Sequence, residues 1–350
     1  MKQKYLGLDG MRGVAAFAVV VFHLREWLGD TPLFQGGYLA VDLFFVLSGF
    51  VIAHAYDARL AEGLGPVAFM RLRAIRLLPL LALGTGLGAM LALSTPGGPA
   101  AWRILAGFCA NAVGLPSPFH GRRIFELDPP AWSLFYELLA NAGFAVAFRW
   151  LGGKALGAIA LISFAVLVVL GVQHGSLDGG MTLSGAPMGL ARVGVSFPLG
   201  VLLHRNRALW SALVPAPPQV LLLAMTVLAL ALPLPASLRL AFDLGFVALL
   251  SPLLVMAGAS LRTERRESRA LVLLGLLSYP VYLLHAPIKR AFEHYAPAIP
   301  SSLAALLVVV LSGLAALAAD RFYDVPVRRW LSGLGRRARA ETEPESGPTV

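Results

Sequence analysis

Cysteine and charge are scarce in this sequence. The chain has 350 residues, a single cysteine, Cys109, and only 14% charged residues, whereas soluble globular proteins average about 25%. One cysteine excludes an internal disulfide and a cluster of thiolate metal ligands. The seven histidines are scattered and form no His-Glu-x-x-His motif. The sequence therefore predicts no metal site.

Two further signals are missing. Basic residues are not interleaved with aromatic residues on a soluble face, so the formal net charge of +10 does not indicate a nucleic-acid partner. The first apolar segment follows a basic start, MKQK, but no Ala-x-Ala-like cleavage site comes after it. We therefore expect a retained helix, not a signal peptide.

Long apolar runs dominate what is present. Hydrophobic residues make up 57% of the chain, and a membrane-spanning helix needs about 20 consecutive apolar residues. The sequence predicts an all-α fold, a polytopic bundle in a lipid bilayer. The ten predicted spans are 8–26, 38–56, 77–93, 131–149, 155–172, 186–203, 219–235, 239–260, 271–289 and 301–320.

The segment AAWRILAGFCANAVGLP, residues 100–116, is a doubtful further span because it is short and contains Arg103. Treating it as re-entrant or interfacial leaves ten spans and puts both termini on one side. Most of the 29 Lys and Arg residues then lie on the side of the N-terminus, which predicts that both termini are cytoplasmic. Counting the segment as spanning inverts every later loop and fits the charges less well.

The predicted domain boundary lies near residue 335. Residues 1–335 are expected to form one membrane-embedded domain, and the polar end of the chain, 336–350, a disordered cytoplasmic tail. We expect no appended soluble catalytic domain, so any chemistry belongs to the bundle and its short loops.

The first span carries a polar stripe. Arg12 and His23 are 11 residues apart, so they project within about 20° of each other on a helix. Asp9 lies three residues before Arg12 and can pair with it. A histidine inside a membrane indicates a functional site, although a hydrogen-bonded core histidine is the alternative.

Asp42 stands near the start of an otherwise apolar segment, AVDLFFVLSGF. Because the connection between the first two spans is short, we expect them to be antiparallel neighbours, with Asp42 and His23 in the same outer half. A carboxylate on one imidazole nitrogen would orient the ring and raise the basicity of the other nitrogen. The alternative is that Asp42 pairs with an arginine and locks the bundle. Gly49 shares the face of Asp42 and allows close helix approach.

Two arginines, Arg73 and Arg76, share a face at the expected cytoplasmic mouth of the third span. Ordinary anchoring at a membrane surface explains such residues. Two adjacent guanidinium groups also suit phosphate binding.

Other polar residues reach a similar depth on different helices. Ser133, Glu137 and Asn141 form a stripe at i, i+4 and i+8, and Arg192 is similarly placed in its own helix. The segment LLSYPVYLLHAPIKR aligns Tyr282 and His285 with Ser278 and Lys289, although Pro280 can distort it. Together these groups predict a polar cavity opening outward.

Six stretches resemble the membrane-bound acyltransferase family 3, whose members move acyl groups, often acetyl, onto extracytoplasmic acceptors such as sugars. They are found in the family's order and extend from residue 6 to 290. They are LDGMRGVAAFAVVVFH, GYLAVDLFFVLSGFVI, RLRAIRLLP, PAWSLFYEL, ARVGVSFPLGVLL and SYPVYLLHAPI.

The resemblance implies roles for individual residues. His23 matches the family's essential histidine of the first helix, and Asp42 matches the acid before the Leu-Ser-Gly-Phe run. Arg73 and Arg76 match the pair associated with acyl-CoA. The Trp-Ser-Leu block with its Glu corresponds to Trp132, Ser133 and Glu137, although Tyr136-Glu137 replaces a Glu-Glu pair found in many members.

These observations lead to a hypothesis of a bacterial inner-membrane O-acyltransferase, a transferase of groups other than aminoacyl groups. The donor is acyl-CoA, in the simplest case acetyl-CoA, and the acceptor is a carbohydrate or glycolipid. The expected catalytic residues are His23, Asp42 and Glu137. The expected donor-binding residues are Arg73 and Arg76, and the expected acceptor-binding residues are Trp132, Ser133, Arg192, Tyr282 and His285.

Several alternatives stay open at this point. A saccharide or lipid transporter would also use buried charges in a ten-helix bundle, and a non-catalytic partner of a polysaccharide synthase would share the composition. Within the acyltransferase hypothesis, direct transfer and an acyl-histidine intermediate are equally compatible with the residues. The acceptor's identity, the acyl chain length and the oligomeric state do not follow from the sequence.

Overall fold

The apolar segments fold into helices, and the residues that the structure describes contain no strand. The computed structural model describes residues 5–29, 31–119, 123–214, 216–261 and 267–342. The helices are α1 Leu6–Leu24, α2 Ala40–Ala61, α3 Pro66–Ser94, α4 Ala101–Ala112, α5 Trp132–Ala147, α6 Gly153–His174, α7 Ala186–Arg205, α8 Arg207–Trp210, α9 Gln219–Ala231, α10 Ala236–Gly245, α11 Ser251–Ser260, α12 Glu267–Tyr295, α13 Ser301–Ala319 and α14 Val325–Thr342. The prediction of an all-α bundle is confirmed.

Nine of the ten predicted spans are long and apolar enough to cross a membrane, counted over the described residues. The exception is the predicted span 219–235, where α9 has 13 residues and is only about 20 Å long. The predicted span 239–260 consists of α10 and α11 joined by a π-helical turn, Phe246–Leu250. The doubtful segment 100–116 contains α4, whose 12 residues extend about 18 Å, so it is too short to span.

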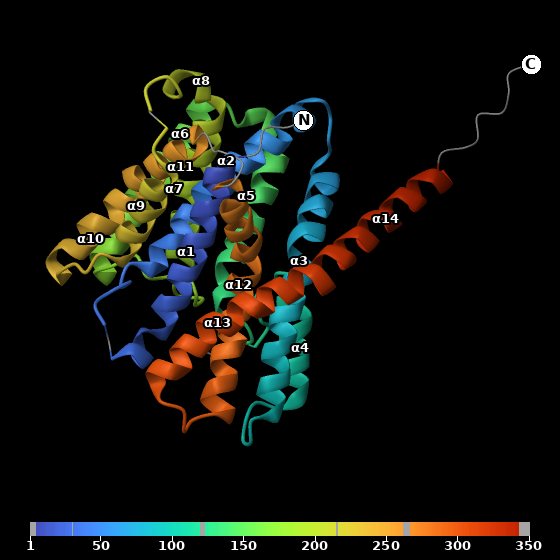
Figure 1. Cartoon of the computed structure of the whole chain (residues 1–350). Coiled ribbons are helices and arrows are strands. Elements are labelled where there is room, and N and C mark those ends of the chain that lie inside the picture. Colours follow the sequence, from blue (N-terminus) through green and yellow to red (C-terminus); the bar gives the residue numbers. More distant parts are fainter. Residues whose placement is uncertain (1–4, 30, 120–122, 215, 262–266, 343–350) are drawn as a thin grey trace, which may run out of the picture.

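The helices pack in an order that differs from their order in the chain. α1 packs along α12, α2 along α7, α6 along α7, and α4 along α3. In Figure 1, α9 and α10 flank one side of the bundle, and α3 and α4 lie on the other. The predicted neighbours α1 and α2 are in contact. Since α12 packs along α1, a helix near the carboxyl terminus lies beside the first helix of the chain.

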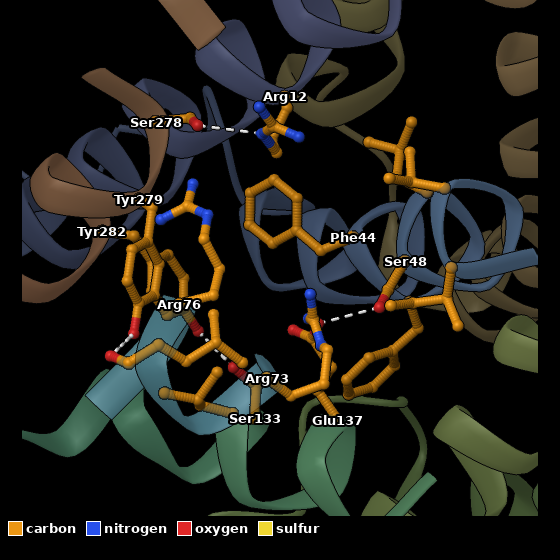
Figure 2. Close-up of a pocket in the computed structure, with 16 residues that line it drawn as sticks. Arg12, Phe44, Ser48, Arg73, Arg76, Ser133, Glu137, Ser278, Tyr279 and Tyr282 are labelled. Carbon is orange, nitrogen blue, oxygen red and sulfur yellow. Dashed lines mark hydrogen bonds and ion pairs between the residues drawn. The ribbon is translucent and has the colours of Figure 1, made fainter. Parts of the chain in front are cut away.

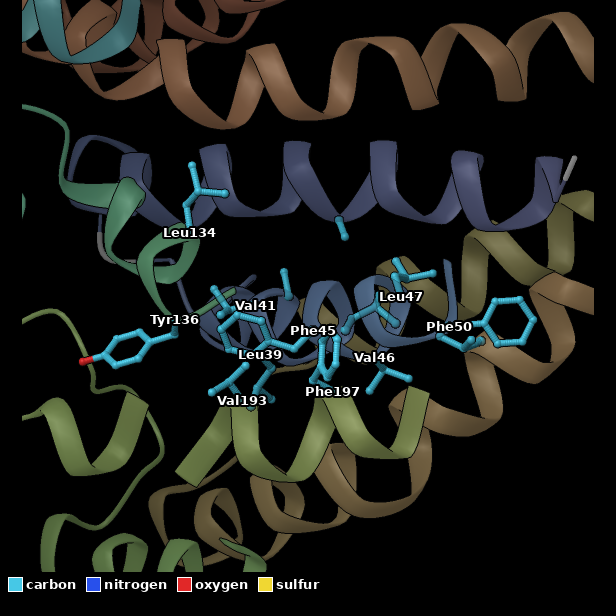
Figure 3. Close-up of a cluster of buried hydrophobic side chains, with 14 of the residues drawn as sticks. Leu39, Val41, Phe45, Val46, Leu47, Phe50, Leu134, Tyr136, Val193 and Phe197 are labelled. Atoms are coloured by element: carbon cyan, nitrogen blue, oxygen red, sulfur yellow. The ribbon is translucent and has the colours of Figure 1, made fainter. Parts of the chain in front are cut away.

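Buried apolar side chains hold α2 against α5 and α7 (Figure 3). Phe45 and Phe50 of α2 are almost fully buried, and Phe197 of α7 packs in the same cluster. In a bilayer an apolar side chain gains little from leaving lipid, so close packing between the helices holds this cluster together. The cluster therefore holds α2 in the orientation that directs Asp42 toward α7.

Glycine makes the α2–α7 contact close. A side chain at Gly49 would meet the Phe197 carbonyl oxygen at 2.1 Å, and one at Gly200 would meet the Val46 carbonyl oxygen at 2.1 Å. Both distances are far below van der Waals contact, so only glycine fits at either position. The expected close approach at Gly49 is confirmed.

The carboxyl-terminal part consists of α13, which packs along α12, and α14. α13 continues through a π-helical turn, Asp320–Asp324, into α14, and Figure 1 shows α14 extending away from the other helices. Residues 343–350 of the predicted tail lie outside the described residues. The domain boundary near 335 stays a prediction.

Candidate active site

A cavity of about 190 Å³ lies between α1, α2, α3, α5 and α12. Figure 2 shows that Arg12, Arg73 and Arg76 from two helices surround it. Its other polar lining residues include Ser48, Ser133, Glu137, Ser278, Tyr279 and Tyr282. Three guanidinium groups around one small space favour an anionic ligand.

Arg73 is held from across the cavity by Glu137 of α5. Its Nη2 donates to Glu137 Oε1 at 2.8 Å, and the same oxygen accepts from the Ser48 hydroxyl at 2.8 Å. Both charged side chains are largely buried, with 13% and 19% exposed. Glu137 thus positions Arg73, and its carboxylate is occupied in this structure.

Arg76 faces the π-helical turn that precedes α14. Its Nη1 lies 3.9 Å from Asp324 Oδ2, and Asp324 also pairs with Arg328 of α14 at 2.7 Å. The guanidinium carbon lies 5.7 Å from the centre of the Tyr279 ring. The Arg76 side chain is nevertheless 43% exposed, which leaves donors available to a ligand.

The expected pair between Arg12 and Asp9 is confirmed, at 2.8 Å. Arg12 Nε donates to Ser278 Oγ at 3.0 Å, which ties α1 to α12 at the cavity wall. All three arginines therefore carry an acidic partner and are held in place without losing all of their N–H donors.

Ser133 and Tyr282 close the other end of this cavity. Their hydroxyl oxygens are 2.7 Å apart, and the Tyr282 hydroxyl also donates to the Pro130 carbonyl oxygen at 2.9 Å. Both side chains were predicted to bind the acceptor, and the structure places them in the cavity lining. One helical turn beyond Tyr282 on α12 is His285.

His285 contacts His23 directly. The His285 Nε2 atom is 3.2 Å from His23 Nδ1. His285 Nδ1 is 3.1 Å from the Val281 carbonyl oxygen, and His23 Nδ1 is 2.9 Å from the Val19 carbonyl oxygen. A carbonyl only accepts, so these bonds assign the proton to Nδ1 on both rings.

The assignment defines the reactive atom of the pair. His23 Nδ1–H is shared between the Val19 carbonyl and His285 Nε2, which accepts. Within the described residues no hydrogen bond reaches His23 Nε2, so its lone pair is available as a base or nucleophile. His285 thus takes the orienting role that the sequence suggested for a carboxylate.

Asp42 does not contact His23, and that prediction was wrong. Both Asp42 oxygens bond Arg192 of α7, with Arg192 Nη2 at 2.6 Å from Oδ2 and Nε at 3.1 Å from Oδ1. Arg192 also donates to the Tyr38 and Gly179 carbonyl oxygens. Both charged side chains are fully buried. The physical reason is geometric, because a planar guanidinium matches both carboxylate oxygens at once. The alternative of an arginine lock is confirmed.

Arg192 and Trp132 therefore lie away from the cavity. The Arg192 guanidinium carbon is 5.5 Å from the Trp132 ring centre, and neither side chain lines the space beside Arg73. Their predicted acceptor-binding role stays a prediction, and their observed contacts are those of helix packing.

Asp128 is a buried carboxyl of a different kind. Its side chain is fully buried, and neither oxygen has a hydrogen-bonding partner within the described structure. Burial raises the pKa of Asp128 well above its ordinary value, against the weaker opposing effect of Arg290. Burial therefore disfavours the charged form of Asp128.

Comparison with known proteins decides the family. A family model described as an acyltransferase domain, type 3, matches residues 5–319. The chain belongs to acyltransferase family 3. It is accordingly a membrane-embedded acyltransferase, a transferase of groups other than aminoacyl groups, and its apolar helices make it a multi-pass protein.

Individual relatives agree with the family. The acyltransferase is 40% identical over 188 residues to "Protein 2 in picA locus" of Rhizobium radiobacter, which covers 48% of this chain and 93% of that protein. It is 45% identical over 51 residues to the O-acetyltransferase OatA of Staphylococcus aureus, strain NCTC 8325, covering 14% of this chain but only 8% of OatA. No solved structure matches this chain.

Sequence reasoning missed several residues of the acyltransferase cavity. Ser48, Tyr279 and Asp324 had no assigned role, yet each contacts a charged side chain at the cavity. Ser48 had a usable signal, since it lies six residues after Asp42 in the same apolar segment. Asp324 had none, because its contact joins segments far apart in the chain.

Proposed function

We propose that this protein is an O-acyltransferase of the bacterial inner membrane that uses cytoplasmic acyl-CoA, in the simplest case acetyl-CoA. The acceptor is a hydroxyl group of an extracytoplasmic or membrane-linked carbohydrate. One observation carries the proposal: a cavity with three arginines ends at Tyr282 of α12, and one helical turn further His285 contacts His23, whose Nε2 has no hydrogen bond within the described residues.

The arginine end of the cavity suits the donor. Coenzyme A carries several phosphate groups, and guanidinium groups bind phosphate through paired N–H donors. The Lys and Arg excess orients this end toward the cytoplasm, where coenzyme A thioesters are made. The apolar wall, which includes Phe44 and Leu47, suits the pantetheine arm.

The histidine end suits the transfer. His23 Nε2 takes the proton of the acceptor hydroxyl while its oxygen forms a bond to the thioester carbonyl carbon. The carbon–sulfur bond then breaks, and the proton held by His23 passes to the departing thiolate. His285 Nε2 accepts from Nδ1–H and stabilises the charge that develops on the His23 ring. The same lone pair also serves an acyl-histidine intermediate.

Acetyl-CoA binding to the purified full-length protein tests this function. Acetyl-CoA is expected to raise the unfolding temperature, because a ligand that binds the native state stabilises it. Arg73→Gln and Arg76→Gln are each expected to weaken binding about tenfold, since a hydrogen bond to a charged group contributes about 1.5–3 kcal/mol.

Arg71→Gln is the matched control. Arg71 lies on the same helix but is exposed and does not line the cavity, so its loss is expected to leave acetyl-CoA binding unchanged. A wild-type protein that shows no response to any acyl-CoA would contradict the acyltransferase proposal and favour a transporter.

A further inference from the structure

A second cavity, of about 680 Å³, lies at the opposite end of α3 from the arginines. Its lining includes Ala92 of α3, Arg103 and Asn111 of α4, and Arg290 of α12. Arg76 and Ala92 are 16 residues apart, or about 24 Å along the helix axis. In Figure 1, α4 packs against the end of α3 that is remote from the α2–α3 loop. The two cavities therefore face opposite sides of the bundle.

The histidine pair lies between the two cavities along α12. Tyr279 and Tyr282 line the first cavity, His285 contacts His23, and Arg290 lines the second. His285 and Arg290 are five residues apart, which is about 7.5 Å along the axis. Donor cavity, histidine pair and second cavity thus follow one another on a single helix.

Arg103 and Arg290 are the two cations among the described lining residues of the second cavity, and buried Asp128 acts on Arg290 from nearby. Within the described residues, neither Arg103 nor Arg290 forms an ion pair. The Arg290 Nη1 donates to the Leu127 carbonyl oxygen at 3.1 Å, which fixes the side chain beside the cavity. Glu126 is the acidic residue in the lining, so the described lining carries a net positive charge.

Two aromatic side chains, Trp102 and Phe119, orient Arg103. The Arg103 guanidinium carbon lies 5.4 Å from the Trp102 ring centre and 5.9 Å from that of Phe119. The two rings pack edge to face at 4.9 Å. Phe119 lines the cavity, so an apolar surface lies next to a positioned cation. This arrangement is complementary to a sugar ring, whose C–H groups pack on an aromatic face while its polar substituents contact a neighbouring charged group.

One buried amide points to a hydroxylated ligand. Asn111 is fully buried and lines the cavity, and its Nδ2 donates to the Leu115 carbonyl oxygen at 3.0 Å. Its Oδ1 has no partner in the described structure. A buried acceptor without a donor is costly, and a ligand hydroxyl would satisfy it.

We propose that this second cavity binds the acceptor saccharide, and that the bound sugar carries a carboxylate held by Arg103 and Arg290. The inference rests on the proposed function and adds the chemical class of the acceptor. The ring packs on Phe119, a hydroxyl donates to Asn111 Oδ1, and the next sugar reaches the lone pair of His23.

Binding of a matched pair of oligosaccharides to the purified full-length protein tests the inference. One probe contains glucuronic acid, and the other is its carboxyl-reduced form, in which a neutral hydroxymethyl group replaces the carboxylate. The acidic probe is expected to bind about tenfold or more tightly than the neutral one, because a charge-assisted pair is lost on reduction. Arg103→Gln is expected to remove that difference, and Phe119→Ala to weaken both probes.

Arg103 is exposed, so Arg103→Gln is expected to fold. Arg25→Gln is the matched control, since Arg25 packs on Phe22 at 4.3 Å and does not line the second cavity. Acetyl-CoA binding is expected to stay unchanged in all three variants, which separates this inference from the proposed function.

Three results would overturn the inference while leaving the donor assignment intact. The first is a normal acetyl-CoA response with no binding of the acidic probe. The second is equal binding of both probes, unchanged in Arg103→Gln. The third is loss of the acidic probe to competing vesicles of phosphatidylglycerol in an Arg103-dependent manner, which would assign the cavity to a lipid headgroup.

Discussion

Asp42 and His23 were expected to act together, yet they belong to regions of opposite character. Asp42 and Arg192 form a fully buried pair between α2 and α7, with every oxygen and nitrogen turned toward protein. His23 lies next to His285 with one ring nitrogen unoccupied. Within the described residues, the first region leaves no polar side-chain atom without a partner, whereas the second leaves His23 Nε2 without a hydrogen bond.

A second arginine–carboxylate pair, Arg73–Glu137, sharpens the contrast. It has nearly the same hydrogen-bond length as the Asp42–Arg192 pair but lines a cavity and keeps some exposure. Charge and residue type are alike in the two pairs, so burial and remaining donors separate a packing role from a binding role. The role of a charged residue in a membrane helix therefore follows from its surroundings and not from its charge alone.

Replacement of His23 is expected to have the largest effect. His23→Ala removes the lone pair that takes the acceptor proton, and a general base contributes about 10²–10⁴-fold to a rate. Acyl esters on cell-surface glycans are expected to fall to the level of cells without the gene. Acetyl-CoA is expected to stabilise the variant as it does the wild type, and near-normal esters would remove His23 from the reaction.

Replacement of Asp42 is expected to act on stability. Asp42→Asn leaves the Arg192 charge buried without a counter-charge, and breaking such a pair costs about 3–5 kcal/mol. Denaturant unfolding in detergent measures the free energy of unfolding.

The double variant Asp42→Asn, Arg192→Met is the control for that experiment. It removes the unpaired charge, so it is expected to recover part of the stability that Asp42→Asn loses. A stable Asp42→Asn protein that has lost activity would return Asp42 to the catalytic group.

Replacement of Glu137 is expected to cost less. Glu137→Gln keeps the shape and weakens the bonds from Arg73 and Ser48, and a hydrogen bond to a charged group contributes about 1.5 kcal/mol or somewhat more. The same unfolding measurement compares it with Asp42→Asn. Equal losses in the two variants would show that the cavity pair is a lock as well.

Asp128 is a third kind of carboxyl, since it is buried without forming an ion pair in the described structure. Its replacement is expected to have the smallest effect on stability. Its pKa is raised in the folded state, so folding is favoured below the unfolded pKa, about 3.9, and stability is lost as pH rises toward the folded pKa. The loss is at most about 1.4 kcal/mol between pH 5 and pH 6.

Asp128→Asn cannot ionise and is expected to flatten that pH dependence. Unfolding at the two pH values measures it for both proteins, and identical slopes would mean that Asp128 keeps an ordinary pKa.

Helix positions were predictable because a long apolar segment in a bilayer satisfies its backbone hydrogen bonds by forming a helix. α6 occupies 153–174 where 155–172 was predicted. The polar stripe on α12 was also visible, and the structure places Tyr282 in the lining of the arginine cavity and His285 against His23. The pairing of helices was not predictable, since Asp42 and Arg192 are separated by 150 residues and the nearest span in sequence seemed the natural partner.

The family match ends at residue 319, whereas the carboxylate beside Arg76 belongs to Asp324. A protein trimmed to the matched domain would keep α1 to α13 and lose Asp324, the acid that pairs with this arginine in the described part of the chain. Asp324 also joins Arg76 of α3 to Arg328 of α14. A bulky fusion partner attached close to α14 would therefore disturb the contacts of Arg76 at the edge of the arginine-lined cavity, and a purification tag is better placed at the other terminus.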